Sequence, residues 1–394
     1  MKKRFSLLIV ALALIFGLVV GAAASGVSYM ARFGDNSTIN YATKFATIMK
    51  VLDTSYVGEI EKDKVSDAAY GAMVAAIDDR WSYYMNAETY ETYQQFQKNS
   101  YNGVGITIVA DEDSKLLKVA GVSEDSPAAQ AGILPGELLC EIDGKELTGM
   151  TAGEVKAIIT EKQGQLMKFL LQAEDGSRRT VELSTKDIFT NPVKSELMED
   201  SVGYIRIKNF EGGSADGVIG AIEELRSRGA QFLVFDVRNN PGGLLSELIK
   251  ILDYILPQGT IFISMDENGK ETTTSSDEAC VNMPMAVLIN ENSYSAAEFF
   301  AAALSEYEWA TTVGAQTSGK ARSQISIELS DGSAVHISTN SYFTPKHVDL
   351  AATGGLTPNV AVSINEQQAE YLAMGKLPKE DDPQLKAAVD SLKT

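Results

Sequence analysis

The sequence is poor in two residue types that build many active sites and metal centres. It contains only two histidines, His336 and His347, and only two cysteines, Cys140 and Cys280, among 394 residues. Two cysteines cannot form a zinc site by themselves or a disulfide framework. So few histidines leave little room for histidine-based catalysis or a multi-histidine metal centre. We therefore expect no metal and no cofactor.

Basic residues are also scarce relative to acidic ones. Lys and Arg total 34 against 53 Asp and Glu, which gives a formal net charge of −19. Such an acidic surface repels phosphate backbones, so we expect no nucleic-acid partner. The composition, 44% hydrophobic and 22% charged, is otherwise that of a globular protein. It excludes a disordered, collagen-like or polytopic membrane protein, and the length suits two or three domains.

Charge is absent altogether from one segment near the start of the chain. Basic residues 2–4 are followed by the uncharged, mostly apolar run 5–31. This is the pattern of an export signal, and the run is long enough for a membrane-spanning helix. We expect residues 1–34 to form an uncleaved single-pass anchor in the cell membrane, with the rest of the chain outside the cytoplasm. Cleavage near residues 22–24 would instead give a secreted protein.

The remaining chain divides into four segments with different patterns. Residues 35–98 carry apolar side chains at helical spacing, which predicts an N-terminal helical region. Residues 99–188 combine short β-rich runs with two helices, enough for one small domain. In residues 189–365 strands alternate with helices, which predicts a mostly parallel sheet. The polar segment 366–394 is expected to form a peripheral tail. The N-terminal helices could pack on their neighbour or pair two copies of the chain into a homodimer, and both interpretations stay open.

The first candidate for chemistry lies at the end of a predicted buried strand. Residues 232–236 form an apolar run that ends in Asp236, and Pro241, Gly242 and Gly243 lead into the next helix. A Pro-Gly-Gly turn in this position leaves free backbone N–H groups at the positive end of a helix. That arrangement suits an anion or a developing oxyanion. The simpler alternative is a tight turn that needs glycine dihedral angles.

The second candidate is Ser295, in a segment that passes from strand to helix through hydroxyl-bearing and small residues. Ser295 would lie at or near the N-terminus of that helix. The simpler interpretation is an ordinary helix cap, in which Glu298, three residues later, completes a capping box. Taken alone, this segment favours the cap over a nucleophile.

A nucleophilic serine needs a base. His336 lies in a predicted strand and His347 in a predicted loop, so neither is favoured. Lys320 follows a Thr-Ser-Gly turn and could point back at the start of the helix that Ser295 precedes. Burial disfavours the ammonium form and would lower its pKa from about 10.4 toward neutrality. A single lysine is more simply interpreted as a solvated surface residue.

Three segments taken together change these interpretations. They are residues 239–243 (Asn-Asn-Pro-Gly-Gly), 292–298 (Asn-Ser-Tyr-Ser-Ala-Ala-Glu) and 317–324 (Thr-Ser-Gly-Lys-Ala-Arg-Ser-Gln). In this order and spacing they resemble the carboxy-terminal processing, or tail-specific, protease family of serine peptidases. Residues 101–187 are similar to the PDZ domain of that family. The likeness extends over about residues 40–365.

The resemblance implies a role for each matching residue. Ser295 would be the nucleophile, Lys320 its general base and Gln324 the residue that orients the lysine. The backbone N–H groups expected to hold the oxyanion are those of Gly242 or Gly243 together with Ala296. The loop expected to capture the terminal carboxylate of a substrate consists of Gly103, Val104, Gly105 and Ile106. The chain departs from the family pattern at Tyr294 and Ala297, and neither position would carry the chemistry.

The fold expected from this resemblance is α/β, with a crotonase-like spiral protease core, an inserted α+β PDZ domain and an N-terminal helical segment. The function implied is that of an extracytoplasmic serine endopeptidase that hydrolyses peptide bonds in protein substrates. Its PDZ domain would recognise substrate C-termini or gate the site. The alternative is a catalytically inactive PDZ-containing adaptor on the same fold. An acyl-CoA enzyme of crotonase type fits less well, because the export signal directs the chain away from cytoplasmic CoA substrates.

Overall fold

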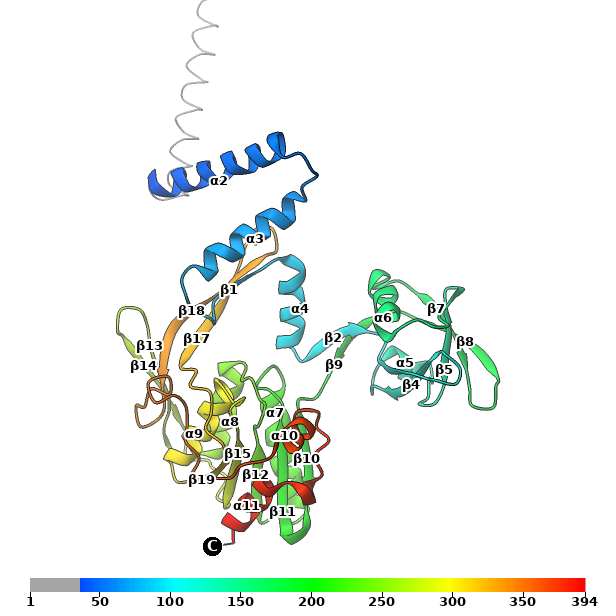
Figure 1. The fold of residues 1–394 in the computed structure, drawn as a ribbon. Coiled ribbons are helices and arrows are strands. Elements are labelled where there is room, and N and C mark those ends of the chain that lie inside the picture. The colour runs from blue at the N-terminus through cyan, green and yellow to red at the C-terminus, as the bar shows by residue number, and fades with distance from the viewer. Residues whose placement is uncertain (1–35, 394) are drawn as a thin grey trace, which may run out of the picture. The chain divides into compact units, whose positions relative to one another are not determined.

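The computed structural model describes residues 36–393, which divide after Ile77 into two units (Figure 1). The first unit consists of α2 (Asn36–Ser55) and α3 (Lys62–Ala75). The rings of Phe45 and Tyr70 stack between these helices, with their centroids 5.7 Å apart. The predicted anchor, residues 1–34, lies outside the described part of the chain. Within residues 36–393, none of the helices combines the length and apolar character needed to span a bilayer.

A six-stranded sheet forms the centre of the second unit. Its order is β10 (Val193–Leu197), β11 (Val202–Ile207), β12 (Phe232–Asp236), β15 (Met285–Ile289), β16 (Ala310–Gly314) and β19 (Val360–Ala361). All neighbours from β11 onward are parallel, and β10 pairs antiparallel at one edge. Every residue of β15 is buried, as expected for a parallel strand covered on both faces. The predicted α/β class and mostly parallel sheet are therefore confirmed.

Helices cover both faces of this sheet. Side chains of α7 (Ser214–Ser227), α8 (Leu245–Ile255) and α9 (Ala296–Glu306) form one core cluster with one face. The other face packs against α11 (Pro383–Ser391), whose Leu385 and Ala388 are buried. The prediction of a peripheral tail is wrong for α11, because two of its apolar residues, Leu385 and Ala388, complete the core on this face of the sheet. The tail also contains α10 (Glu366–Ala373) and the 3-10 helix η2 (Lys379–Asp381).

A second sheet brings an early part of the chain to a late one. It contains β1 (Tyr83–Met85), β13 (Gly259–Met265), β14 (Glu271–Ser276), β17 (Arg322–Glu328) and β18 (Ala334–Phe343). Tyr83 of β1 pairs with His336 of β18. The segment 78–98, which also forms α4 (Ala87–Gln97), is thus part of the second unit. The sequence pattern places this segment with the N-terminal helices, and that grouping is wrong because a pairing partner some 250 residues away leaves no local pattern.

The small domain has its own sheet and core. Strands β3 (Ile106–Ala110), β4 (Leu117–Val122), β5 (Leu138–Ile142), β7 (Met167–Gln172) and β8 (Arg178–Leu183) follow one another, and β6 (Lys145–Glu146) pairs with β5. Helices α5 (Pro127–Gln130) and α6 (Ala152–Glu161) complete it, around buried residues such as Leu139 and Phe169. Both chain connections run through an antiparallel pair, β2 (Ser100–Gly103) and β9 (Lys186–Phe189). The domain is therefore an insertion in the chain of the second unit. Outside this domain, the 3-10 helix η1 (Glu199–Ser201) directly precedes β11 of the main sheet.

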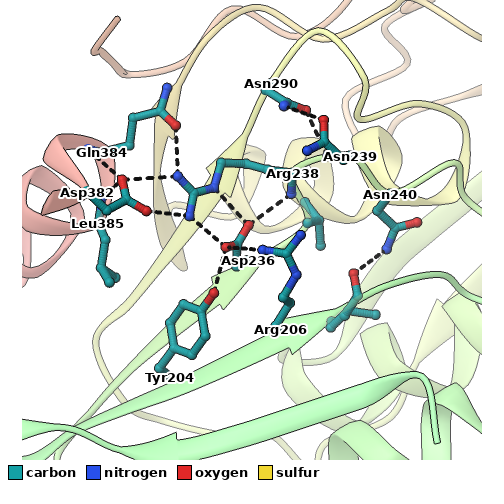
Figure 2. Close-up of polar contacts among 12 residues, drawn as sticks. Tyr204, Arg206, Asp236, Arg238, Asn239, Asn240, Asn290, Asp382, Gln384 and Leu385 are labelled. Carbon is teal, nitrogen blue, oxygen red and sulfur yellow. Dashed lines mark hydrogen bonds and ion pairs between the residues drawn. The ribbon is translucent and has the colours of Figure 1, made fainter. Parts of the chain in front are cut away.

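A buried network of charges ties the tail to the main sheet (Figure 2). Arg238, only 2% exposed, pairs with Asp236 and with Asp382, each at 2.7 Å. Gln384 accepts a further hydrogen bond from Arg238, and the Tyr204 hydroxyl donates one to Asp236. Burial alone would raise the pKa of Asp236, but the charge of Arg238 lowers it to about 2. Buried charges are tolerated when they are paired and hydrogen-bonded in this way, so the network joins the end of β12 to the start of α11.

Removing one partner tests this network. We expect Asp382→Ala to lower the free energy of unfolding by about 3–5 kcal/mol, because it leaves a buried guanidinium partly unpaired. The matched control is Asp381→Ala, since the neighbouring Asp381 is exposed. Urea denaturation of both variants measures the difference, and equal stabilities would contradict the proposed importance of the network.

Candidate active site

The carboxyl ends of β12 and β15, the two strand ends that the sequence singled out, lie side by side in the main sheet. β12 and β15 are parallel neighbours, so the turns that follow them leave the sheet at the same edge. The turns are joined by hydrogen bonds, because Asn239 N–H donates to Asn290 Oδ1 at 2.9 Å and Asn290 Nδ2 donates to Asn239 Oδ1 at 2.8 Å (Figure 2). In open α/β sheets, ligand sites form at the carboxyl ends of strands. The register of the sheet thus brings the Pro-Gly-Gly turn to the serine segment.

Gly242 allows the closest approach between the two turns. Its φ is 90°, a left-handed conformation that favours glycine. A Cβ atom at this position would lie 2.8 Å from Ser295 Cβ and 2.9 Å from Ala296 N. The N–H of Gly242 is already engaged, since it donates to Asn240 Oδ1 at 2.8 Å. The turn therefore needs glycine dihedral angles at Gly242, and its backbone packs against the serine segment.

The adjacent N–H groups are differently placed. Gly243 has a φ of 150° and forms an isolated bridge with Phe210. The hydrogen bonds of that bridge use the carbonyl of Gly242 and the N–H of Leu244. Within the described residues, no acceptor is bonded to the N–H of Gly243 or to that of Ala296, the first residue of α9. These two donors are free to bind an anion beside Ser295.

Ser295 has a strained backbone, and its side chain is hydrogen-bonded to the Tyr342 hydroxyl. Its φ of 57° and ψ of −125° lie outside the regions that serine ordinarily adopts. Strain of this kind concentrates at functional sites. Its side chain makes no capping hydrogen bond to α9, so the interpretation as an ordinary capping box is wrong. The buried hydroxyl of Tyr342 lies against Ser295 and donates to the carbonyl of Lys320.

Glu298 binds the lysine segment as well as the backbone of Ser295, the residue that precedes its own helix. This fully buried carboxylate accepts hydrogen bonds from Thr317 Oγ1 at 2.6 Å, Gly319 N at 2.7 Å and Lys320 N at 2.9 Å. Burial raises the pKa of Glu298 above its ordinary value, while these donors act in the opposite direction. The side chain therefore fixes the backbone of Lys320 relative to the first turn of α9.

The Lys320 side chain lies in a largely buried site. Burial lowers its pKa to about 8, against the opposing effect of Asp79. Its ammonium lies over the Trp81 ring, 4.4 Å from the centroid, and this ring also packs on Tyr294 at 5.7 Å. In the described part of the chain no hydrogen bond joins Lys320 Nζ to the Ser295 hydroxyl. The predicted base is thus desolvated and near the serine, with its charge resting on an aromatic face.

A cavity of about 240 Å³ collects most of the predicted residues. Its lining includes Gly243, Ser295, Ala296, Lys320 and Gln324 but not Gly242. The Gln324 amide donates from Nε2 to Arg322 O at 2.9 Å and to Ser338 Oγ at 3.0 Å, rather than to the lysine. Other lining residues come from distant segments or have no motif around them, and no local sequence pattern indicates them: Tyr83, Tyr93, Gln97, Glu211, Leu244, Leu245, Leu248, Phe262, Phe299 and Tyr342. Pro241 and Ser323, which belong to the motif segments, and His336 line the cavity as well.

The two histidines lie where the sequence predicted them. His336 is a half-buried residue of β18, and its Nδ1 lies 2.9 Å from Ser326 Oγ. Burial, assisted by Lys320, lowers its pKa to about 4, so the ring is neutral near pH 7. His347 lies in a loop and pairs with Glu271 at the surface. His336 also lines the cavity, which its place in a strand did not indicate.

The predicted carboxylate-binding loop connects β2 to β3 of the small domain. Val104 is buried, and its carbonyl accepts a hydrogen bond from Ala128 N–H. Gly105 has a φ of 89°, and a Cβ atom there would lie 2.1 Å from the Cβ of Ser126. Gly103 and Ile106 end and begin the flanking strands. β3 is an edge strand of its sheet, so its unpaired side can accept an added strand.

Comparison with known proteins agrees with this geometry. Residues 201–362 match the model of peptidase family S41, and residues 118–182 match that of the PDZ domain. A carboxyl-terminal-processing protease of Picosynechococcus sp. is 31% identical over 337 residues, 84% of this chain and 80% of that protein. The corresponding protein of Synechocystis sp. is 30% identical over 81% of this chain and 75% of its own length.

Two further comparisons extend this likeness. The carboxy-terminal processing protease CtpA of Bacillus subtilis is 29% identical over 355 residues, 89% of this chain and 76% of that protein. Among solved structures, a Bacteroides fragilis protein described as a candidate S41 protease has a TM-score of 0.52 at 16% identity. The match covers 88% of this chain and 96% of that one. At this identity the structural match supports the fold.

The role of Glu298 can be tested without any assay of function. Glu298→Gln keeps the size of the side chain but replaces one acceptor oxygen with a donor group. We expect it to lower the free energy of unfolding by about 1–3 kcal/mol, because buried N–H groups lose their acceptor. Urea denaturation measures the change. Glu291→Gln, at an exposed position of the same segment, is the control. Equal effects of the two substitutions would contradict the role of Glu298.

Proposed function

Because the chain belongs to the carboxyl-terminal processing proteases of peptidase family S41, we propose that Ser295 and Lys320 form its catalytic dyad. As a member of this family, the protein is a serine protease that acts on protein C-termini. The observation that carries the proposal is the meeting of Ser295, Lys320 and the free N–H groups in one cavity. These groups come from three separate segments, and each has the property that peptide hydrolysis requires.

In the proposed reaction, the Ser295 hydroxyl attacks the carbonyl carbon of a peptide bond. Neutral Lys320 takes the hydroxyl proton and then gives it to the departing amine. Water releases the resulting acyl group from Ser295 in a second step. Burial, which lowers the pKa of Lys320 to about 8, supplies a neutral base near physiological pH. Lys320 must leave the Trp81 ring to reach the hydroxyl, so a shift of this side chain is part of the proposal.

Gly243 and Ala296 are the proposed oxyanion donors. Their N–H groups are unoccupied in the described structure, and both residues line the cavity together with Ser295. Gly242 had been an equal candidate on sequence grounds, but its N–H is committed to Asn240. Its contribution is the close approach that places Gly243 beside the serine. Two backbone donors aimed at the developing charge stabilise it without reorganisation.

Gln324 is the proposed positioning residue for Lys320. Its Nε2 donates to the carbonyl of Arg322 and to Ser338 Oγ. These bonds hold the amide nitrogen away, which leaves the amide oxygen to accept a hydrogen bond from the lysine. Such a bond would orient Lys320 once its ammonium has left Trp81.

We assign residues 99–188 as the PDZ domain, and residues 189–365 together with 78–98 as the protease core. A substrate C-terminus would add as a strand to β3, with its carboxylate on the loop from Gly103 to Ile106. The free outer edge of β3 supports this mode. Tethering the substrate in this way raises its local concentration at the protease core. The same docking could gate the cavity.

We further propose that residues 1–34 anchor the protein in the membrane with its catalytic region outside the cytoplasm. The basic residues 2–4 and the uncharged run 5–31 support this. The first unit supports the proposed homodimer. Large apolar side chains on α2 and α3 are exposed there, including Tyr41 at 72% and Met73 at 70%. A second copy of the same helices would cover such a surface.

The dyad is tested by cleavage of an unstructured protein such as casein. We expect the wild type to cleave it, and Ser295→Ala and Lys320→Ala to lose about 10²-fold or more of kcat/KM. Lys270→Ala, at an exposed lysine, is the control and should retain activity. Residual cleavage that is equal in all variants would refute the assigned site. No cleavage by any of them, even with C-terminal peptides added, would favour an inactive adaptor.

The pH dependence of the wild-type enzyme follows from the lysine. The base is active when neutral, so kcat/KM should rise with pH and level off above about pH 8, the pKa of Lys320. Initial rates between pH 6 and pH 9.5 on a single peptide measure the profile. A rate that is constant over this range would exclude Lys320 as the titrating base.

The dimer is tested by sedimentation of the full chain in detergent. Met73→Glu places a charge on the exposed face of α3 and should shift the protein toward the monomer. Leu166→Glu is the matched control, because Leu166 is similarly exposed at 64% but lies in the PDZ domain. A wild type that sediments as a monomer would overturn the proposed dimer.

A further inference from the structure

One carboxyl group in the catalytic cavity is not used by the proposed mechanism. Glu211 lines the cavity and is only 6% exposed. Within the described residues, its Oε2 is buried and has no hydrogen-bond partner. A buried polar group normally finds a partner, and an unpaired one is costly. The position therefore calls for a partner that arrives with the substrate.

The surroundings of Glu211 are acidic and aromatic. Burial, reinforced by the nearby charge of Glu247 and opposed by Lys320, raises the pKa of Glu211 to about 7. The charge of Glu211 also contributes, after burial, to the raised pKa of Tyr83. Aromatic rings of Tyr83, Tyr93, Phe262 and Phe299 line the same cavity. A carboxylate among aromatic faces suits a cation, because both the charge and the ring electrons attract it.

Glu211 also lies directly behind the proposed oxyanion turn. A Cβ atom on Gly243 would lie 2.4 Å from the carbonyl carbon of Phe210 and 2.7 Å from Glu211 N. The N–H of Phe210 donates to the carbonyl of Gly242, and the N–H of Leu244 donates to the carbonyl of Phe210. A substrate residue whose carbonyl oxygen binds at Gly243 therefore carries its side chain close to the cavity that Glu211 lines.

The size of the cavity limits its occupant. Its volume of about 240 Å³ is below the roughly 300–1,000 Å³ of pockets that hold drug-sized ligands. A single extended side chain fits this space. An apolar side chain would leave Glu211 buried without a partner, and an acidic one would repel it. A lysine or arginine side chain passes its methylene groups along the aromatic walls and brings N–H donors to the carboxylate.

We propose that Glu211 is a specificity-determining residue, which selects a lysine or arginine side chain next to the scissile bond. The proposal rests on the catalytic function assigned to Ser295 and Lys320, and it names the class of substrate residue that this site accepts. Binding of the cationic side chain gives Oε2 the partner that it lacks in the free protein. The selected peptide then lies with its carbonyl group at Gly243 and Ala296.

Cleavage of two peptides tests this selection in the full-length protein. The peptides are identical except for lysine or norleucine at the residue that supplies the scissile carbonyl, so they differ only at the end of that side chain. We expect the wild type to favour the lysine peptide in kcat/KM by about tenfold or more. Glu211→Gln should reduce this ratio to near one, and Glu211→Leu should reverse it. Glu278→Gln, at an exposed glutamate, should keep the wild-type ratio.

Binding to an inactive protein separates this inference from the proposed function. With Ser295→Ala, calorimetry measures the affinity for both peptides without cleavage. We expect tighter binding of the lysine peptide, and equal binding once Glu211→Gln is added. This result would support the selection of a lysine side chain even if the wild type cleaved neither peptide. Absence of cleavage would refute only the proposed dyad. The common C-terminus of the peptides cancels any contribution from the PDZ domain.

Two outcomes would overturn the role of Glu211. One is equal binding and equal cleavage of the two peptides by proteins that carry Glu211. The other is a loss of kcat/KM in Glu211→Gln that is the same for both peptides and is accompanied by a shift of the pH profile. That pattern would mean that Glu211 acts through Lys320 rather than on the substrate. The unfolding midpoint of each variant, compared with the wild type, identifies any loss that comes from misfolding.

Discussion

The arrangement of the site depends on one buried carboxylate, that of Glu298. It lies on the first turn of α9, directly after the proposed nucleophile, and accepts hydrogen bonds from the segment that carries Lys320. A buried carboxylate is costly unless its acceptor positions are filled, and here three donors fill them. Because the buried Glu298 carboxylate needs these donors, the backbone of Lys320 is held in one position. Glu298 links the serine and lysine segments, together with a backbone hydrogen bond from Ser318 N–H to the carbonyl of Ser293. The Ser295 and Lys320 side chains themselves share no hydrogen bond within the described residues.

The parallel sheet supplies the frame for that contact. Neighbouring strands β12 and β15 end at the same edge, so the glycine turn and the serine turn meet there. Gly242 then lets one backbone pack on the other. Below this edge, Arg238 joins Asp236 at the end of β12 to Asp382 before α11 (Figure 2). The tail therefore supports the turn that carries the proposed oxyanion donor, although it contributes nothing to the cavity.

An aromatic residue of the segment that precedes the PDZ domain, Trp81, forms part of the environment of the Lys320 side chain. Trp81 belongs to the segment that pairs with β18, and its ring accepts the Lys320 ammonium. Burial lowers the pKa of Lys320, and the charges of Asp79, Glu211 and Glu298 oppose this shift without cancelling it. The segment before the PDZ domain thus reaches the catalytic cavity.

The sequence alone determined the α/β class and the proposed residues Ser295 and Lys320, because strand periodicity and short motifs are local properties of the chain. It could not decide between Gly242 and Gly243, since the choice depends on which N–H group Asn240 occupies. It misjudged the tail and the use of Glu298, whose partners lie far away in the chain. Glu211 and Trp81 acquire their significance only in the folded protein, because burial, an unfilled acceptor and an aromatic face beside a charge exist only after distant segments pack together.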